Sequence, residues 1–470
     1  MGGGLLQLVA YGAQDVYLTG NPQITFFKVA YRRHTNFALE AIEQTFNGNA
    51  NYGSRVTCQI SRNGDLIHRV YLQVTLPANP ASNITNTGAD YNYYNYFGLR
   101  LLNYVEIEIG GQKIDKHYAH WLYVWNELSL PRSKSHGYNQ MVGAYGTANL
   151  QNSTLYIPLE FWFCRNIGLA LPLIALQYHE VKININFESY QNCLYTTSTT
   201  APTLAKASLW VDYIYLDTDE RRRFAQLSHE YLIEQLQFTG TEAITGAQGS
   251  KIKLNFNHPC KELIWFVSNP LQSDHDRLNW CNFTTSRYAL GDVGATTAGS
   301  VNYLGDNYDK LSTVLKHSDI DYSSLGENYK KVNFMPCNPI KNCKLVLNGN
   351  DRFYQRTGKY FNLVQPYQHH TNVPTNAGIN VYSFALKPEE HQPSGTLNMS
   401  RIDTAILNVD FENKPANNTS YNYNSTLAAF TGNSSGITPY DPSVYNIYVY
   451  AVNYNVLRIL SGMGGLAYSN

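Results

Sequence analysis

The stretch YIYLDTDERRRF at residues 213–224 and the stretch YVYAVNYNVLRI at residues 448–459 share a pattern of aromatic, apolar and polar side chains. At their separation of 235 residues, three pairs of identical residues coincide: Tyr213 with Tyr448, Tyr215 with Tyr450, and Arg223 with Arg458. Alternation of apolar and polar residues over a short run is typical of a half-buried β-strand. The two stretches therefore predict that one β-fold occurs twice in this chain.

Five more pairs of strand-like runs occur in the same order along both halves. They are residues 37–45 with 231–239, 65–77 with 259–270, 105–111 with 343–349, 156–161 with 381–386, and 181–187 with 405–411, at offsets of 194, 193, 238, 225 and 224 residues. Gly, Asn, Pro and Ser separate the runs, as in all-β sandwiches. One such match is weak, but the ordered series predicts an all-β protein of two tandem sandwiches, divided between about residues 223 and 230.

The second copy is the longer one, because the offset grows from 193 to 238 residues between its second and third runs. The gain of 45 residues falls within residues 271–340, a stretch rich in Asn, Ser, Asp and Gly. An insertion of this length on a sandwich is expected to form a surface loop. In the first copy, apolar residues at spacings of three and four predict a helix at residues 117–129.

The charge balance argues against a protein that coats nucleic acid. The formal net charge is zero, with 35 Lys and Arg residues against 35 Asp and Glu residues, and only 15% of the chain is charged. Binding to a phosphate backbone needs a concentrated excess of Lys and Arg, so we expect no direct nucleic-acid binding. The 38 tyrosines, each with a large apolar face and a polar tip, suit strands and contacts between protein copies.

The cysteines indicate neither a disulfide framework nor a zinc site. Their number is odd and no Cys-x-x-Cys pair occurs; they are Cys58, Cys164, Cys193, Cys260, Cys281, Cys337 and Cys343. We expect reduced thiols that act as small apolar core residues. The first residues lack the basic region of a signal peptide, and no run reaches the 18 apolar residues that a membrane span needs.

Longer motifs carry a resemblance that runs from end to end. They lie at residues 8–28, 31–40, 60–67, 108–117, 169–182 and 210–226 in the first half, and at 229–240, 254–259, 347–353 and 453–468 in the second. In these motifs the chain resembles the major capsid proteins of the nucleocytoplasmic large DNA viruses, the family of the chlorella-virus, iridovirus and marseillevirus capsid proteins.

The resemblance implies a double jelly roll, with two eight-stranded jelly rolls side by side, long surface loops and a few short helices. It divides the chain into an N-terminal arm at residues 1–31, a first jelly roll at 32–224, and a second at 225–470 that carries the insertion 271–340. The insertion, with loops near residues 79–97 and 138–151, is expected to form towers on the outer face. The arm is expected on the inner face of the shell, near an internal membrane.

The resemblance also implies the function. Three copies are expected to form a homotrimer, a pseudo-hexagonal capsomer that contacts neighbouring capsomers and the minor capsid and penton proteins in the icosahedral shell of a large double-stranded DNA virus. The protein is then a virion component, assembled at viral factories in the host cytoplasm, with no catalytic residue and no cofactor.

Eight Asn-x-Ser/Thr sequons are candidate glycosylation sites. Asn282 is the first choice because it lies in the expected outer insertion, and the others are Asn83, Asn152, Asn398, Asn417, Asn418, Asn424 and Asn433. A chain so rich in Asn, Ser and Thr produces many sequons by chance. Without a signal peptide, a sugar has to come from virus-encoded enzymes, as the resemblance allows.

Two histidine pairs raise the question of a cupin-type metal site. His117 and His120 are three residues apart, and His369 and His370 are adjacent. Cupin ligands alternate as His-x-His, whereas adjacent strand residues point to opposite faces of a sheet, so we predict no metal site. In the run DERRR at residues 219–223 two acids offset two of three arginines. It predicts either a solvated segment or a junction between the jelly rolls, where Arg222 or Arg223 is the candidate to pair with an acid of the neighbouring sandwich.

Three alternatives remain open from the sequence. A sugar-active enzyme on two jelly rolls needs paired carboxylates in a cleft, and no acid stands in a motif for such work. A carbohydrate-binding protein fits the loops rich in Asn and Tyr. A transient viral assembly scaffold of the same fold differs only in its absence from mature particles.

Overall fold

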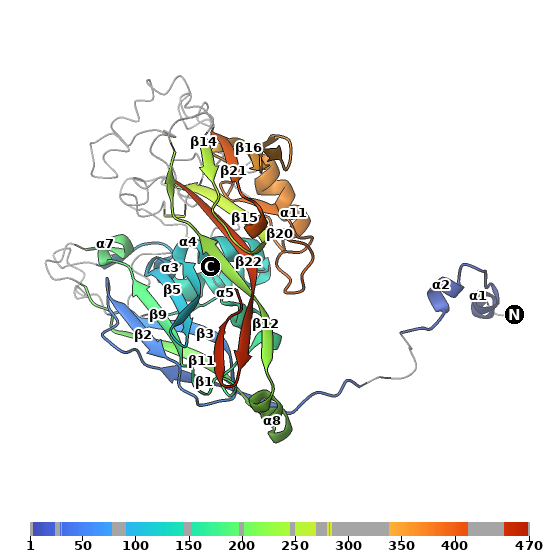
Figure 1. The fold of residues 1–470 in the computed structure, drawn as a ribbon, viewed down its shortest axis with the longest axis horizontal. Coiled ribbons are helices and arrows are strands. Elements are labelled where there is room, and N and C mark those ends of the chain that lie inside the picture. The colour runs from blue at the N-terminus through green and yellow to red at the C-terminus, as the bar shows by residue number, and fades with distance from the viewer. Residues whose placement is uncertain are drawn as a thin grey trace.

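The computed structural model describes residues 3–23, 29, 31–77, 91–144, 153–196, 202–244, 250–268, 280–281, 283, 338–411 and 446–468. Two β-sheet bodies lie against each other, and the N-terminal segment extends away from both (Figure 1). Strand β22 (Asn446–Leu460) runs along the second body and down beside the first.

The first body is a sandwich of two antiparallel sheets. One sheet has the order β1-β11-β3-β7, formed by β1 (Phe37–Gln44), β11 (Lys206–Leu216), β3 (Leu66–Thr75) and β7 (Thr154–Pro158), with β8 (Leu171–Pro172) paired to β3. The other has the order β2-β9-β5-β6, formed by β2 (Arg55–Gln59), β9 (Val181–Phe187), β5 (Leu102–Ile109) and β6 (Gln112–Tyr118). Eight strands in two such sheets make a jelly roll.

The second body repeats the first strand for strand. Its sheets have the orders β12-β22-β15-β19 and β14-β21-β16-β17, formed by β12 (His229–Phe238), β22, β15 (Pro259–Ser268), β19 (Asn380–Ser383), β14 (Ser250–Lys253), β21 (Ala405–Phe411), β16 (Ile340–Leu347) and β17 (Asn350–Asp351). Shorter strands add to these sheets or pair separately: β13 (Glu242–Ala243), β18 (Arg356–Thr357), β20 (Leu397–Asn398), β23 (Met463–Leu466), and β4 (Tyr91–Tyr93) with β10 (Leu194–Thr196). The two tandem sandwiches predicted from the repeat, and the double jelly roll implied by the resemblance, are therefore confirmed.

One detail of the predicted repeat is wrong, namely the register of its last strand. Val211 lies opposite Val70 in the first jelly roll, and Ala451 lies opposite Leu263 in the second. Because Val70 and Leu263 are 193 residues apart, the residue that matches Val211 is Ala451, 240 residues later rather than 235. A shift of an odd number of residues exchanges the two faces of a strand.

The consequence is visible in the tyrosines that suggested the alignment. Tyr213 belongs to the core of the first jelly roll, whereas Tyr448 and Tyr450 point away from the core of the second, whose residues include Val449 and Ala451. The corrected offset matches Tyr450 with Trp210 instead.

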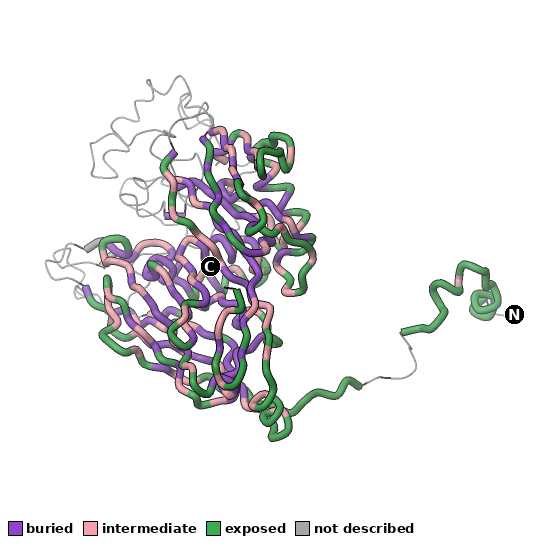
Figure 2. Tube along the Cα trace, in the orientation of Figure 1, coloured by how far each residue is buried: buried purple, intermediate pink, exposed green. Residues whose placement is uncertain are grey.

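The sheet β12-β22-β15-β19 is covered on both faces. From β15, Leu263 and Trp265 face the second core, while Ile264 and Phe266 belong to the cluster that is continuous with the first jelly roll. This double burial explains why β15 is a nearly unbroken apolar run instead of an alternating one. In Figure 2 the buried colour continues from one body into the other along these strands.

Helices occupy the connections. Helix α4 (Ala119–Ser129) confirms the helix expected at residues 117–129. Helix α5 (Arg132–Val142) overturns part of the loop expected at 138–151, because Tyr138 and Val142 are buried on it and only residues 145–151 of that loop lie outside the described part. The other helical segments are short: α1 (Gly3–Val9), α2 (Val16–Thr19), α3 (Phe97–Arg100), α6 (Trp162–Arg165), η2 (Ile167–Leu169), α7 (Tyr190–Cys193), α8 (Thr218–Gln226), η4 (Tyr360–Val364), α11 (Gln365–His369) and η5 (Met399–Arg401). None of the helices in the described ranges has the length and apolar character needed to cross a membrane.

Candidate assembly surfaces

The junction between the jelly rolls is built around the turn from β6 into α4. Tyr118 lies edge-on to Phe238 with ring centroids 5.0 Å apart, and Trp121 lies 5.5 Å from Tyr450. These contacts bring the first jelly roll onto the outward face of the sheet β12-β22-β15. Because aromatic pairs of this kind bury large apolar areas, they hold the two bodies in a fixed relation.

Part of the insertion is anchored at the same junction. His120 stacks on Trp280 with ring centroids 4.5 Å apart, and its Nε2 lies 3.3 Å from the Trp280 carbonyl oxygen. Desolvation by the surrounding rings lowers the pKa of His120 to about 4, so the ring is neutral at physiological pH. Phe283 packs nearby on Phe266, 3.9 Å between centroids. The expectation that residues 271–340 form an outer tower therefore needs one correction, because Trp280, Cys281 and Phe283 are buried; the remaining residues up to 337 lie outside the described part.

A buried ion cluster crosses the junction. Lys261 Nζ, fully buried on β15, lies 2.6 Å from Glu234 Oε1, and Arg165 Nη1 of the first jelly roll lies 2.9 Å from Glu234 Oε2. The Arg165 guanidinium also sits 4.1 Å from the Trp125 ring centroid. One carboxylate thus joins a cation from each jelly roll in a largely buried site.

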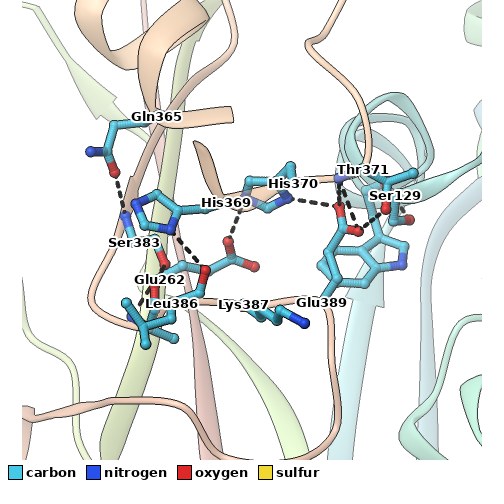
Figure 3. Close-up of polar contacts among 12 residues, drawn as sticks. Ser129, Glu262, Gln365, His369, His370, Thr371, Ser383, Leu386, Lys387 and Glu389 are labelled. Carbon is cyan, nitrogen blue, oxygen red and sulfur yellow. Dashed lines mark hydrogen bonds and ion pairs between the residues drawn. The ribbon is translucent and has the colours of Figure 1, made fainter. Parts of the chain in front are cut away.

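A second cluster stabilises the loop that reaches back to the first jelly roll. Figure 3 shows His370 between two carboxylates: its Nε2 lies 2.9 Å from Glu262 Oε2 and its Nδ1 lies 2.9 Å from Glu389 Oε1. The side chains of His370 and Glu262 are completely buried. Burial alone would lower the pKa of His370, but the two carboxylates outweigh it and raise the pKa to about 9. The imidazolium therefore compensates the buried charge of Glu262.

The residues after His370 bind the end of α4. The Asn372 backbone N–H donates to the Leu128 carbonyl oxygen at 3.0 Å, and Thr375 Oγ1 donates to Glu127 Oε2 at 2.8 Å. The pKa of the Glu127 carboxyl is raised, chiefly by burial.

The C-terminal hairpin of β22 and β23 clasps the first jelly roll on another side. The Tyr178 N–H donates to the Gly462 carbonyl oxygen at 2.9 Å, and His179 Nδ1 lies 2.8 Å from the Gly464 carbonyl oxygen. A Cβ atom at Gly464 would lie 2.6 Å from Leu176 Cδ2, so a larger residue here requires the Leu176 side chain or the hairpin to shift. The chain is therefore tied across the junction at four places: the aromatic contact, both clusters and the hairpin.

The N-terminal arm is the most exposed apolar segment of the described chain. Leu8 is 80% exposed and Tyr17 is 91% exposed, and helices α1 and α2 have no buried residue. Figure 2 shows the arm as exposed along its described length. Apolar side chains held this far from a core are typical of a segment that binds another molecule.

The four histidines have separate environments. His117 Nε2 lies 2.9 Å from Asp115 Oδ2 and its ring stacks on Phe161, whereas His120 contacts Trp280. His369 Nδ1 lies 2.9 Å from the Leu386 carbonyl oxygen, away from the carboxylates that flank His370. Within the described ranges, no group of three or more His, Cys, Asp or Glu residues has the arrangement of a metal site.

The DERRR run is helix α8, which links the two jelly rolls. The arginine that pairs with an acid of a neighbouring element is Arg221, whose Nε lies 2.9 Å from Asp65 Oδ1 in the first jelly roll. Arg223 instead pairs within the helix with Glu220 at 3.6 Å. The predicted choice of Arg222 or Arg223 was therefore wrong by one or two positions, because a helix places residue 221, not 222 or 223, toward the β3 end.

Of the candidate glycosylation sites, only Asn398 lies in the described part of the chain. It is exposed at the start of η5, where its Oδ1 accepts from the Ser400 N–H at 3.1 Å. Asn83, Asn152, Asn282, Asn417, Asn418, Asn424 and Asn433 lie outside the described residues. The six described cysteines are free and buried, and burial raises the pKa of the Cys58 thiol to about 12, in keeping with inert apolar residues; Cys337 lies outside the described part.

Comparison with known proteins agrees with this architecture. The family model described as major capsid protein N-terminus matches residues 25–217, and the model described as large eukaryotic DNA virus major capsid protein matches residues 220–465. The major capsid protein of Phaeocystis pouchetii virus is 48% identical over 547 residues, and that of Paramecium bursaria Chlorella virus 1 is 45% identical over 486 residues, each with 100% of both chains covered.

Solved structures give the same result. A structure of the PBCV-1 virus capsid has a TM-score of 0.71 and 39% identity, covering 95% of this chain and 100% of that one. The Faustovirus major capsid protein, at 14% identity, shares the fold with a TM-score of 0.65 over 96% of this chain and 94% of that one. With both jelly rolls matched in sequence and in structure, the chain belongs to the major capsid protein family of large eukaryotic DNA viruses, whose members form the capsid shell of the virion.

Proposed function

We propose that three copies of this chain form a pseudo-hexagonal capsomer that tiles the shell without catalysing a reaction. The observation that carries the proposal is that the two sandwiches have equivalent strand orders: β1-β11-β3-β7 in the first corresponds to β12-β22-β15-β19 in the second. A trimer of such chains has six nearly equivalent bodies around its axis and so fits a hexagonal position. Identical units with repeated modest contacts assemble into a closed shell.

The proposed parts follow the chain: an arm at residues 1–31, a first jelly roll at 32–224, and a second at 225–470. The exposed apolar residues of α1 and α2 support an arm that binds minor capsid proteins or the membrane side of the shell. The sequons, Asn282 first, remain candidate sites for sugars on outer loops.

The junction also bears on the enzyme alternative. A cavity of about 220 Å³ opens there, and Glu188 is the one acidic residue among those that line it. A glycosidase needs two carboxylates across its cleft, so the residues that line this cavity do not support the sugar-active alternative.

The test is the mass of the purified full-length chain in solution, measured by light scattering. A stable species at three times 53.2 kDa is the expected result. A chain that stays monomeric at every concentration up to the one at which capsids assemble would contradict the proposal.

A further inference from the structure

The contact between the jelly rolls inside one chain has two sides. One side is the turn of β6 into α4, the helix between the fifth and sixth of the eight main strands of the first jelly roll, β6 and β7. The other side is the outward face of β12-β22-β15, where Phe266, Tyr448 and Tyr450 point away from the second core. Each side has a counterpart in the other jelly roll, because the strand order is duplicated.

The counterpart of the receiving side is the outward face of β1-β11-β3-β7. Trp210 matches Tyr450 in the corrected register, and it stacks on Tyr71 with ring centroids 6.3 Å apart and an angle of 1° between the planes. Tyr71 in turn lies 6.0 Å from Tyr156. This aromatic band is open: Tyr156 is 38% exposed, and Leu39 on the same face of β1 is 54% exposed.

Among the described residues, one part of that face is covered: Ile214, which lies opposite Leu39, packs with Ala170 and with Phe224 of α8. The band formed by Leu39, Tyr71, Tyr156 and Trp210, here called the receiving band, is apolar sheet surface of the kind that is fully covered in the second jelly roll. A surface buried in one copy of a duplicated fold and open in the other is a candidate for contact between chains.

The counterpart of α4 is the segment η4–α11, which also lies between the fifth and sixth of the eight main strands of its jelly roll, β17 and β19. Three of its apolar side chains are exposed in the described part of the chain: Tyr367 is 79% exposed, Leu363 46% and Val364 39%. Leu386, whose carbonyl oxygen contacts His369 of α11, is 71% exposed. This set, here called the inserting segment, is the equivalent of the residues that α4 buries against the second jelly roll.

We infer that the inserting segment of one copy docks on the receiving band of the next copy, which repeats between chains the contact that joins the two jelly rolls within a chain. The inference rests on the proposed trimer. The contact is heterologous, with different surfaces on the two partners, and three such contacts close a ring with six similar junctions. Asp212 beside the receiving band and Lys359 beside the inserting segment add opposite charges.

The test compares three full-length variants with the wild-type chain. The first is Leu363→Asp with Tyr367→Asp, the second is Leu39→Asp with Tyr156→Asp, and the matched control is Tyr17→Asp on the exposed arm. Light scattering over a dilution series measures the trimer dissociation constant, and thermal unfolding checks that each variant is folded. Either double variant is expected to raise the dissociation constant at least about 100-fold, as removal of central interface residues does, while the control leaves it unchanged.

Hydrogen exchange gives a second readout. Because the inserting segment of one copy would cover the receiving band of the next, the variant in the inserting segment is expected to increase exchange in β1 and β7. Folded variants that remain trimers, with unchanged exchange in β1, would overturn the inference and leave the proposed trimer intact. A monomeric wild-type chain would overturn both.

Discussion

Glu262 shows how this protein tolerates charge in its interior. Its carboxylate is completely buried on β15, and the imidazolium of His370 lies 2.9 Å away with Glu389 on the other ring nitrogen. A buried carboxylate without a partner costs several kcal/mol, so the fold depends on the protonated state of His370. The same logic applies to Lys261, whose ammonium is buried against Glu234.

The His370 cluster predicts a dependence of stability on pH. The folded-state pKa of about 9 lies above the unfolded value near 6.5, so the stabilisation is complete below pH 6.5 and is lost as pH rises to 9. The loss amounts to about 3 kcal/mol. Thermal unfolding midpoints measured from pH 6.5 to 9.5 are expected to fall, and His370→Gln is expected to flatten this part of the profile. The exposed-site control His136→Gln keeps the wild-type slope; an equal slope in His370→Gln would refute the assignment.

Removal of the shared carboxylate charge provides a second test at this scale. Glu234→Gln keeps the shape but leaves the buried Lys261 ammonium and the Arg165 guanidinium without their counter-charge, and we expect the free energy of unfolding to fall by about 3 kcal/mol. The double variant Glu234→Gln with Lys261→Met also removes the buried ammonium and is expected to recover part of the loss. Chemical denaturation measures both, and a double variant no more stable than the single one would count against a charge effect.

These clusters could not be predicted from the sequence. Arg165 meets Glu234 from 69 positions away, and Glu262 meets His370 from 108, so no local pattern connects them. His370 was considered in the sequence as a possible metal ligand. Its role is instead set by Glu262 and Glu389, which only the fold brings near it.

At the scale of elements, the order of strands was predictable and the register was only partly so. The predicted match of residues 181–187 with 405–411 has the correct register: β9 pairs with β5 in the first jelly roll in the same way as β21 pairs with β16 in the second. The aliphatic side chains of these strands are buried on one face only, and this fixes the alignment. The last strand misled because tyrosine suits both faces: Tyr213 is in a core and Tyr450 is at a junction. Burial on both faces removed the alternation that fixes register.

The C-terminal hairpin offers a test of an element. Gly464→Ala places a methyl group 2.6 Å from Leu176 Cδ2 and 3.3 Å from Ile109 Cγ2, so either these buried side chains repack or the hairpin moves from the first jelly roll. We expect a loss of about 1–2 kcal/mol in unfolding free energy. Gly137→Ala on the exposed side of α5 meets no atom within 4 Å and serves as the matched control, with no loss expected. Equal effects of the two substitutions would show that the clasp is not tight.

For the whole molecule, the arm and the body are expected to act separately. Deletion of residues 2–31 removes exposed helices that have no buried residue, so trimers are expected to form with unchanged thermal stability. The shell is expected to fail, because the arm is the proposed contact with inner-face partners. Electron microscopy of particles made with the truncated chain checks this, and normal virions would refute it.

The duplicated body is the central claim of this account, and a cryo-EM reconstruction of the purified full-length protein tests it most directly. The account predicts a threefold particle with six β-sandwiches at nearly equal angles around the axis, and with η4–α11 of each copy seated on the sheet β1-β11-β3-β7 of its neighbour. A particle with one chain, or a trimer whose second jelly rolls make no contact with the neighbouring first jelly rolls, would contradict it.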